Sequence, residues 1–197
     1  MTDTELVVLS QQGDLRAFNE LAGKAHAGLF PFVRRMLGTS EDAQDVCQEA
    51  LLKAYLNIRR LREPEKFRPW LHHIALNLCR DWHRSAQARP HFQSLDLEEG
   101  AEGVRLPEMS LVPAQEEAIR WQTAQALLER LSLEQRTAIL LREYQGFTSD
   151  EIAEITGVPA ATVRTRIFYG LRAIHQMLAE QNAPSDRPKG MKGGERA

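Results

Sequence analysis

Histidines and cysteines that could bind a metal ion or take part in catalysis are concentrated in one stretch: His72, His73, Cys79 and His83. On a helix, Cys79 and His83 would share a face because they are four residues apart. His72 and Cys79 are seven residues apart, about 10 Å along a helix axis, which is too far for both to bind one zinc ion at about 2.0–2.3 Å. The sequence also has no CxxC, HExxH or glycine-rich phosphate loop. We therefore expect no catalytic site, no metal, no cofactor and no small-molecule substrate.

A second set of side chains with chemical potential follows the predicted helix Pro159–Glu180. Its apolar residues recur at helical spacing and are expected to point inward: Val163, Ile167, Leu171 and Ile174. The side chains that then point outward include no acid: Thr162, Arg164, Thr165, Phe168, Tyr169 and Arg172. Arginine reads guanine edges in the major groove and neutralises phosphates, and we expect Arg166 and Arg172 to meet phosphates. The pattern favours binding to duplex DNA.

The residues before this helix have the pattern of a helix-turn-helix. Thr148 and Glu151 form a capping-box pair that places the start of a helix at Ser149. Ala153, Gly157 and Val163 then supply a small contact residue, a turn and an apolar anchor, and Pro159 suits a first helical turn. A small helical bundle with a basic, solvated face is the alternative interpretation.

A third set lies on the predicted helix from about Lys66 to Ala88. Its core stripe comprises Phe67, Trp70, Leu71, Ile74, Ala75, Leu78 and Trp82. The opposite face carries His73, Asn77, Arg80, Asp81 and Arg84. Asparagine and arginine with few acids suit contacts to phosphates or to unstacked bases.

The predicted helix Ser40–Arg60 has a polar face with apolar residues in it. Its core stripe is complete without them: Ala43, Val46, Cys47, Ala50, Leu51, Ala54 and Ile58. The far side carries Asp45, Gln48, Glu49, Leu52, Lys53 and Leu56. Exposed leucines among acids and amides indicate a surface that docks on a partner. Coverage by another part of the same module is the alternative, and periodicity does not decide between the two.

The remaining elements that position these faces are also helical. Helices are expected at Asp14–Leu37, Ala114–Leu131, Leu133–Tyr144 and Ser149–Thr156, and no strand-like alternation occurs. Prolines, glycines and acids between Arg89 and Pro113 indicate a linker, and the residues from Asn182 lack an apolar stripe. The sequence therefore predicts an all-α fold with two small helical domains joined by a flexible acidic linker. The expected boundaries are 1–88, 89–113, 114–181 and, for a disordered tail, 182–197.

Charge is distributed in blocks along the chain, although the net charge is only −2. Residues 59–91 contain 8 basic and 3 acidic side chains and residues 159–197 contain 7 and 3, whereas residues 92–118 contain 1 and 7. The pattern suggests two contacts with a polyanion, separated by an acidic connector. With no apolar run of membrane-spanning length, no signal-peptide pattern and two cysteines, the chain is expected in the cytoplasm, without direct membrane insertion.

These segments resemble a known family, the extracytoplasmic-function (ECF) type of bacterial RNA polymerase sigma factor. The runs RAFNEL, EDAQDVCQEALLKAY and FRPWLHHIALNLCRDW look like its region 2, at Arg16–Leu21, Glu41–Tyr55 and Phe67–Trp82. The runs LLERLSLEQRTAILLREYQGFTSDEIAEITGVP and ATVRTRI look like its region 4. The resemblance covers about residues 3–88 and 114–178. It implies a transcription initiation factor that binds core RNA polymerase and is not an enzyme.

The resemblance also implies roles for the three faces. The face with Asp45, Gln48, Glu49 and Leu52 would bind core polymerase. The loop Arg62–Pro69 and the face with Asn77, Arg80 and Arg84 would open the minus-10 element and hold the single-stranded non-template strand. The second helix of the helix-turn-helix would read the minus-35 element as duplex. An anti-sigma factor is a further expected partner.

One departure from the family pattern concerns DNA affinity. Where the family usually has basic residues after ATVRTRI, this chain has Tyr169, Gly170 and Leu171. Two expected positive charges are missing, and a glycine inside a helix costs about 1 kcal/mol relative to alanine. A stand-alone helix-turn-helix transcriptional regulator is the alternative function, and it would leave the leucine-containing face of residues 41–55 unexplained.

Overall fold

A computed structural model describes residues 1–88 and 115–182 of the chain, and within these ranges it contains helices and no strand. The first region comprises α1 (Asp3–Gln11), α2 (Leu15–Leu37), α3 (Ser40–Asn57), η1 (Ile58–Arg60), η2 (Pro64–Lys66) and α4 (Phe67–Ala88). The second comprises α5 (Gln115–Glu129), α6 (Leu133–Ile139), η3 (Leu140–Tyr144), α7 (Ser149–Thr156) and α8 (Ala160–Asn182). The predicted all-α class is confirmed.

Helix α1 was missed by the sequence analysis. The Thr2 side chain accepts a hydrogen bond from the Glu5 amide and the Glu5 side chain accepts one from the Thr2 amide, which completes a capping box. Leu6 and Val7 are fully buried against α2 and η2. A nine-residue helix is too short for its periodicity to stand out, so the capping pair was the available signal.

Helices α2 and α3 begin and end at residues that the sequence marks. The Asp14 carboxylate accepts hydrogen bonds from the amides of Arg16 and Ala17, and Gly38 ends α2 with a left-handed φ of 89°. The Thr39 side chain then caps α3. The helix expected over Ser40–Arg60 ends at Asn57 and tightens into the 3₁₀ turn η1, which brings the buried Ile58 onto the core.

The second region contains the predicted helix-turn-helix. Thr148 and Glu151 form both hydrogen bonds of a capping box at the start of α7. Gly157 ends α7 with φ 74°, in the left-handed region that favours glycine. Helix α8 follows and crosses α6 and α7. The helix expected over Leu133–Tyr144 is α-helical to Ile139 and then widens into a π-helical turn.

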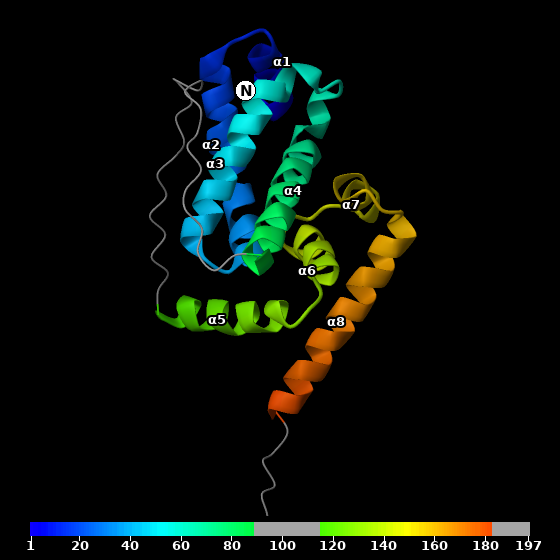
Figure 1. Cartoon of the computed structure of the whole chain (residues 1–197). Helices are drawn as coiled ribbons and strands as arrows, with labels where there is room; N and C mark the ends of the chain where they lie inside the picture. The colour runs from blue at the N-terminus through cyan, green and yellow to red at the C-terminus, as the bar shows by residue number, and fades with distance from the viewer. Residues whose placement is uncertain (89–114, 183–197) are drawn as a thin grey trace, which may run out of the picture.

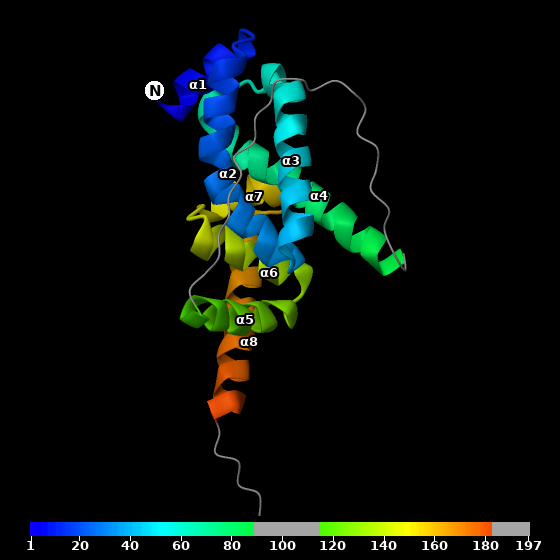
Figure 2. The same cartoon turned by 90° about the vertical axis from the view of Figure 1, so that its left-hand side faces the viewer.

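The two regions pack directly against each other. In Figure 1, α7 lies beside α4, and α6 lies between α4 and α8. Figure 2 shows α5 lying crosswise below the C-terminal end of α2. A single hydrophobic core runs through both regions, from Leu6 in α1 to Met177 in α8. The sequence predicted two helical units but not their contact. The expected linker 89–113 and most of the expected tail lie outside the described residues.

Candidate nucleic-acid interface

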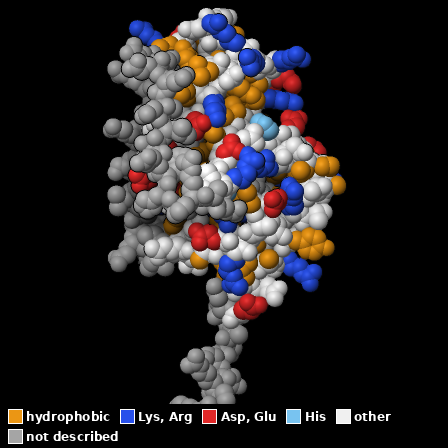
Figure 3. All heavy atoms as spheres, viewed as in Figure 1, with side chains coloured by type: hydrophobic (Ala, Val, Ile, Leu, Met, Phe, Trp, Pro, Cys, Tyr) orange, Lys and Arg blue, Asp and Glu red, His pale blue; other side chains and the backbone are white. Residues whose placement is uncertain are grey.

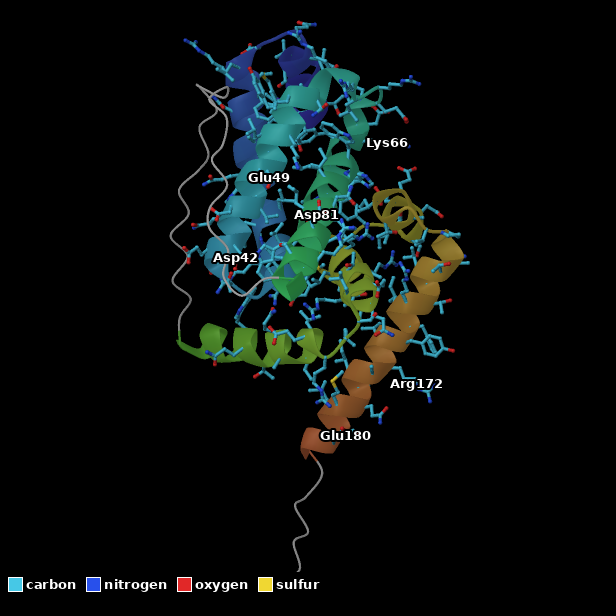
Figure 4. The ribbon with its side chains drawn as sticks, in the orientation of Figure 1. Asp42, Glu49, Lys66, Asp81, Arg172 and Glu180 are labelled. Carbon is cyan, nitrogen blue, oxygen red and sulfur yellow. The ribbon has the colours of Figure 1, made fainter. Side chains whose placement is uncertain are left out.

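The outer face of α8 is exposed and carries most of the residues expected to bind duplex DNA. Arg164, Thr165 and Arg172 are exposed, and so are the two aromatic residues Phe168 (61%) and Tyr169 (53%). Figure 4 shows Arg172 on the side of α8 that points away from α4. Figure 3 shows basic and hydrophobic side chains mixed along this edge of the molecule. The face is free to meet another molecule.

Two of the expected residues are placed differently. Thr162 and Arg166 are half-buried. Arg166 lies near Arg80 of α4. Burial lowers the pKa of the Arg80 guanidinium, and the positive charge of Arg166 lowers it further. Arg166 thus faces the other region and lies apart from the outer face of α8.

Gly170 has a packing role that the sequence did not show. A Cβ atom at this position would lie 2.6 Å from Cδ1 of Ile139 and 3.3 Å from Cβ of Gln135. Both neighbours belong to α6, and Ile139 is itself buried. The glycine therefore allows α8 to approach α6 closely, which offsets its poor helix propensity.

The polar face of α4 borders the helix-turn-helix and is bonded to it at His73, although His73 and Asn77 stay exposed. Nδ1 of His73 donates a hydrogen bond to the main-chain oxygen of Ile155 in α7 (2.8 Å), which leaves Nε2 as an acceptor for the Asn77 amide (3.0 Å). Nη1 of Arg80 donates to Oδ1 of Asn77 (3.4 Å). Lys66 forms an ion pair with Glu154 of α7, with Nζ 3.1 Å from Oε1. The hydrogen-bonding capacity of this face is thus partly used within the chain.

Arg84 lies beyond the part of α4 that borders the helix-turn-helix. Its guanidinium forms an ion pair with Asp81 one turn earlier, and both side chains are largely exposed. Asn77 and Arg84 are therefore exposed, whereas Arg80 is half-buried next to region 4.

A short loop at the end of η3 inserts into the first region. Gln145 is only 7% exposed, and its Nε2 donates to the main-chain oxygen of Gly28 in α2 (3.0 Å). Nη2 of Arg68 donates to the main-chain oxygen of Gln145 and, at 3.3 Å, to its Oε1. Arg68 also lies 4.5 Å over the ring of Phe147. We call residues 145–147 the latch loop.

His72 lies beneath the latch loop and is 2% exposed. Its Nδ1 is 2.9 Å from the main-chain oxygen of Arg68 and its Nε2 is 3.1 Å from Oε1 of Gln145. A neutral imidazole has one N–H and can donate to only one of these oxygens. Burial nevertheless lowers the pKa of His72 to about 4, although both oxygens favour the protonated ring. The ring packs on Phe32 and edge-on to Phe147.

The α3 residues expected to bind a partner face outward, as predicted. Asp45 and Gln48 are exposed, and Glu49 and Leu52 are half-buried. Leu56, one turn beyond Leu52, is 64% exposed. Figure 4 shows Glu49 on the side of α3 away from α7 and α8. Within the described residues, no segment distant in sequence covers Leu56.

The cysteines and histidines have structural surroundings. Burial raises the pKa of the Cys47 thiol, and it raises that of Cys79 to about 12. His83 donates from Nε2 to the main-chain oxygen of Met36 (3.1 Å). Within residues 1–88 and 115–182, no three acidic, histidine or cysteine side chains are grouped so that they could hold a metal ion.

An exposed face with Arg164 and Arg172 on a helix-turn-helix, packed against a second helical region, is an arrangement of a DNA-binding transcription factor. Residues 24–89 match Sigma-70 region 2 and residues 121–174 match Sigma-70, region 4. The chain belongs to the ECF RNA polymerase sigma factors of this family.

Named relatives agree with this assignment. The RNA polymerase sigma-H factor of Pseudomonas aeruginosa is 34% identical over 89% of this chain and 93% of its own length. The ECF RNA polymerase sigma-E factors of Haemophilus influenzae and Escherichia coli are both 35% identical, over 85% and 88% of this chain and 90% and 93% of their own lengths.

Two solved structures share the fold. CnrH, bound to the cytosolic domain of CnrY, matches with a TM-score of 0.68 and 23% identity, over 90% of this chain and 97% of CnrH. The sigma factor RpoE of Bartonella quintana, bound to the anti-sigma factor NepR, matches with a TM-score of 0.60 and 23% identity, over 83% and 94%.

The chain is therefore a transcription initiation factor that directs RNA polymerase to promoters. Its family is not known as a class of enzymes. Among the described helices, none is both long and apolar enough to span a membrane. The alternative of a stand-alone regulator is set aside, because the match includes region 2 as well as the helix-turn-helix.

Proposed function

We propose that three faces of the chain divide the work of promoter recognition. The docking face of α3 binds core RNA polymerase, the polar face of α4 captures the opened minus-10 element, and the outer face of α8 reads the minus-35 duplex. The single observation that carries this proposal is that these faces lie on three different helices within the matched regions. The functional units are residues 1–88 and 114–181.

The α3 face suits a protein partner because acids, an amide and leucines alternate on it. Asp45 and Gln48 supply polar contacts, and Leu52 with the exposed Leu56 supplies apolar area. Burial of a leucine side chain is worth about 1.5–3 kcal/mol. This face therefore combines apolar area with polar contacts, as protein–protein interfaces do.

The α8 face suits a major groove because arginines flank hydroxyl and aromatic groups. Arg164 and Thr165 are near the N-terminal half of α8, the part of a recognition helix that reaches base edges. Arg172, two turns further on, is placed for a phosphate. Phe168 and Tyr169 add apolar contacts, for which thymine methyl groups are one target.

The polar face of α4 is suited to binding single-stranded DNA. Asn77 and Arg80 provide an amide and a guanidinium side by side, and Arg84 extends the positive charge. Removing a base from the stack costs a few kcal/mol, which contacts of this kind must offset. The segment 62–69 leads into this face, and its Arg68 is held by the latch loop.

One further partner follows from the relatives. Because the structural neighbours are complexes with anti-sigma proteins, we infer that a protein inhibitor also binds this chain. The chain acts where core polymerase and promoter DNA are, which places its activity in the cytoplasm.

The test is run-off transcription with purified core polymerase and genomic promoter fragments. We expect transcripts only when the chain is present. Asp45→Arg with Gln48→Arg should abolish co-purification with core polymerase without changing helical content, because both side chains point outward. Gln122→Arg with Gln176→Arg, on exposed positions of α5 and α8, is the matched control. Normal co-purification of the folded α3 double variant would remove the docking assignment.

A further inference from the structure

Three arginines are clustered where α3 ends and the chain turns toward α4. Arg59 and Arg60 belong to η1, and Arg62 follows it in the loop. All three are exposed, and none forms an ion pair with an acid of the described residues. In Figure 1 this end of the first region lies at the top, and Figure 3 shows Lys and Arg side chains gathered there. We call Arg59, Arg60 and Arg62 the η1 cluster.

The backbone that carries the η1 cluster is fixed in place. Nε2 of Gln11 in α1 donates to the main-chain oxygens of Ile58 (3.0 Å) and Leu61 (2.7 Å). Ile58 is 2% exposed, so its side chain anchors η1 on the core. Nη2 of Arg59 lies 3.5 Å from the place of a Cβ on Gly13, in the turn between α1 and α2. The three charges are therefore held close together before any partner binds.

The acids closest in the chain do not neutralise the η1 cluster. Glu63 forms its ion pair with Lys66, with Oε2 3.5 Å from Nζ. Glu65 of η2 is exposed and pairs with none of the three arginines. Like charges that are held together repel one another, and a row of phosphates removes that repulsion and releases counterions. The η1 cluster is therefore suited to a polyanion.

The η1 cluster lies on the continuation of the polar face of α4. The segment 62–69 joins the two, and Figure 4 shows Lys66 at this end of α4. Phe67, where α4 begins, is ten residues before Asn77, which is about 15 Å along the helix axis. Roughly three to five nucleotides of a DNA strand span this distance. A strand held by Asn77 and Arg80 can therefore reach the η1 cluster without leaving the first region.

A protein partner is the competing interpretation, because the exposed Leu56 of the docking face lies one turn before the cluster. Protein interfaces combine apolar anchors with polar groups of both kinds. Residues 59–62 instead offer three guanidinium groups, and their one apolar residue, Leu61, is half-buried. This composition favours phosphates.

We propose that the η1 cluster binds phosphates of the non-template strand in the nucleotides that adjoin the minus-10 element. Arg59 and Arg60 hold the strand where it continues past the polar face of α4, and they contribute affinity without base preference, because phosphates carry no sequence information. The inference rests on the proposed function of α4.

The first experiment removes two charges from the η1 cluster. Arg59→Gln with Arg60→Gln is assembled with core polymerase, and its binding to a promoter template already melted at the minus-10 element is measured across a salt series. The matched control is Lys24→Gln with Arg130→Gln, which removes two exposed charges from α2 and from the end of α5. Circular dichroism establishes that both proteins are folded.

We expect the η1 variant to bind the template about tenfold more weakly at low salt. The dependence of log affinity on log salt should become shallower by about 1.4, since each phosphate contact on a single strand contributes about 0.7. The control should change neither quantity, and the affinity of the η1 variant for core polymerase without DNA should equal that of the native chain. A loss of affinity for core polymerase would overturn the proposal in favour of a protein contact.

The second experiment locates the phosphates. Neutral methylphosphonate linkages replace the phosphates of the non-template strand one at a time, through the minus-10 element and the nucleotides on either side. We expect linkages in the nucleotides beside the element to weaken native binding by about threefold to fivefold each, and to have no effect on the η1 variant. Linkages within the element should weaken both proteins alike.

Equal sensitivity of the native chain and the η1 variant at every linkage would overturn the proposal and leave the arginines as solvated surface charges. Failure of the proposed function would look different. Native binding would then tolerate every neutral linkage within the minus-10 element, whatever the linkages beside it show.

Discussion

The two candidate DNA-binding faces lie on helices of nearly equal length, the 22 residues of α4 and the 23 of α8, yet they differ in their contacts with the rest of the chain. On α8, Arg164 and Arg172 extend into solvent. On α4, Asn77 is bonded to Arg80 and to His73, and His73 is bonded to Ile155 of α7. The residue types on the two faces are similar, but the contacts that each face makes within the chain depend on the tertiary structure. A nucleic acid that approaches α4 therefore meets side chains that already hydrogen-bond within the chain.

The largest expected effect concerns the polar face of α4. Asn77→Ala with Arg80→Ala should lower open-complex formation on duplex promoters by about a hundredfold, since hydrogen bonds to charged groups contribute about 1.5–3 kcal/mol each. On templates already melted at the minus-10 element, the defect should shrink because the opening energy is supplied. Permanganate footprinting on both templates measures the difference. The control is Arg130→Ala, which is exposed after α5. Equal losses on both templates would make α4 a general phosphate contact.

The next prediction concerns pH, because His72 is buried beneath the latch loop. Burial lowers the pKa of His72 to about 4, below its ordinary value of 6.5, so the unfolded chain binds the proton first as pH falls. The stability that depends on neutral His72 is fully present above pH 6.5 and is lost as pH falls toward 4. We expect the free energy of unfolding to fall by about 2 kcal/mol more in the native chain than in His72→Gln between pH 7 and pH 5.

Urea denaturation at a series of pH values measures this difference. The other charged group near His72 is Arg68 of α4, whose guanidinium also disfavours the protonated ring. The pKa values of His26 and His83 are also lowered by burial, but both residues are present in both proteins. If the free energy of unfolding depends on pH in the same way in the native chain and in His72→Gln, then His72 is not enclosed by region 4.

The third prediction tests why α8 tolerates a glycine. Gly170→Ala should lower the free energy of unfolding by about 1 kcal/mol, because overpacking against Ile139 outweighs the gain in helix propensity. Gly23→Ala in α2 is the matched control, since no atom lies within 4 Å of the added Cβ, and it should stabilise by about 0.4–1 kcal/mol. Chemical denaturation measures both. Stabilisation by both changes would mean that α8 does not pack closely on α6.

Local signals predicted single helices well. Helix α7 was placed to the residue because Thr148, Glu151 and Gly157 are side chains whose hydrogen bonds and backbone angles fix its ends. The outward position of Asp45 and Gln48 followed from a complete apolar stripe on the opposite side of α3. Such features depend on neighbours within about a turn of helix, which the sequence displays directly.

The contact between the regions could not be predicted in the same way. Its central residues, Gln145 and His72, are polar and belong to no apolar stripe, so periodicity gave no sign that they are buried. Gly170 was interpreted as a weakness for the same reason, because the neighbour that requires it, Ile139, is 31 residues earlier. The docking face of α3 and the DNA-binding roles remain predictions that the experiments above test.

A smaller effect is expected at the outer face of α8, where two arginine variants separate recognition of bases from neutralisation of phosphates. Arg164→Ala should cost about 1–3 kcal/mol and relax preference at one base pair, whereas Arg172→Ala should weaken all sequences alike and reduce the salt slope by about one. Binding of the chain to minus-35 duplexes with single base-pair changes, measured across a salt series, distinguishes these outcomes. Full base discrimination by Arg164→Ala would mean that other side chains of α8 read the sequence.

The smallest expected effect is a gain of affinity at the same face. Tyr169 stands where the family usually has a positive charge, and it is 53% exposed with its ring edge-on to Phe168, 5.3 Å between centroids. Because the side chain is largely solvated, Tyr169→Arg should leave the free energy of unfolding within about 0.5 kcal/mol of its native value. One added phosphate contact should steepen the dependence of log affinity on log salt by about 0.9 and raise affinity mainly at low salt.

Tyr169→Gln, which changes shape without charge, should leave the slope unchanged. If Tyr169→Arg gives no steeper slope, the phosphate backbone does not pass this turn of α8, and the duplex must approach the helix closer to Arg164.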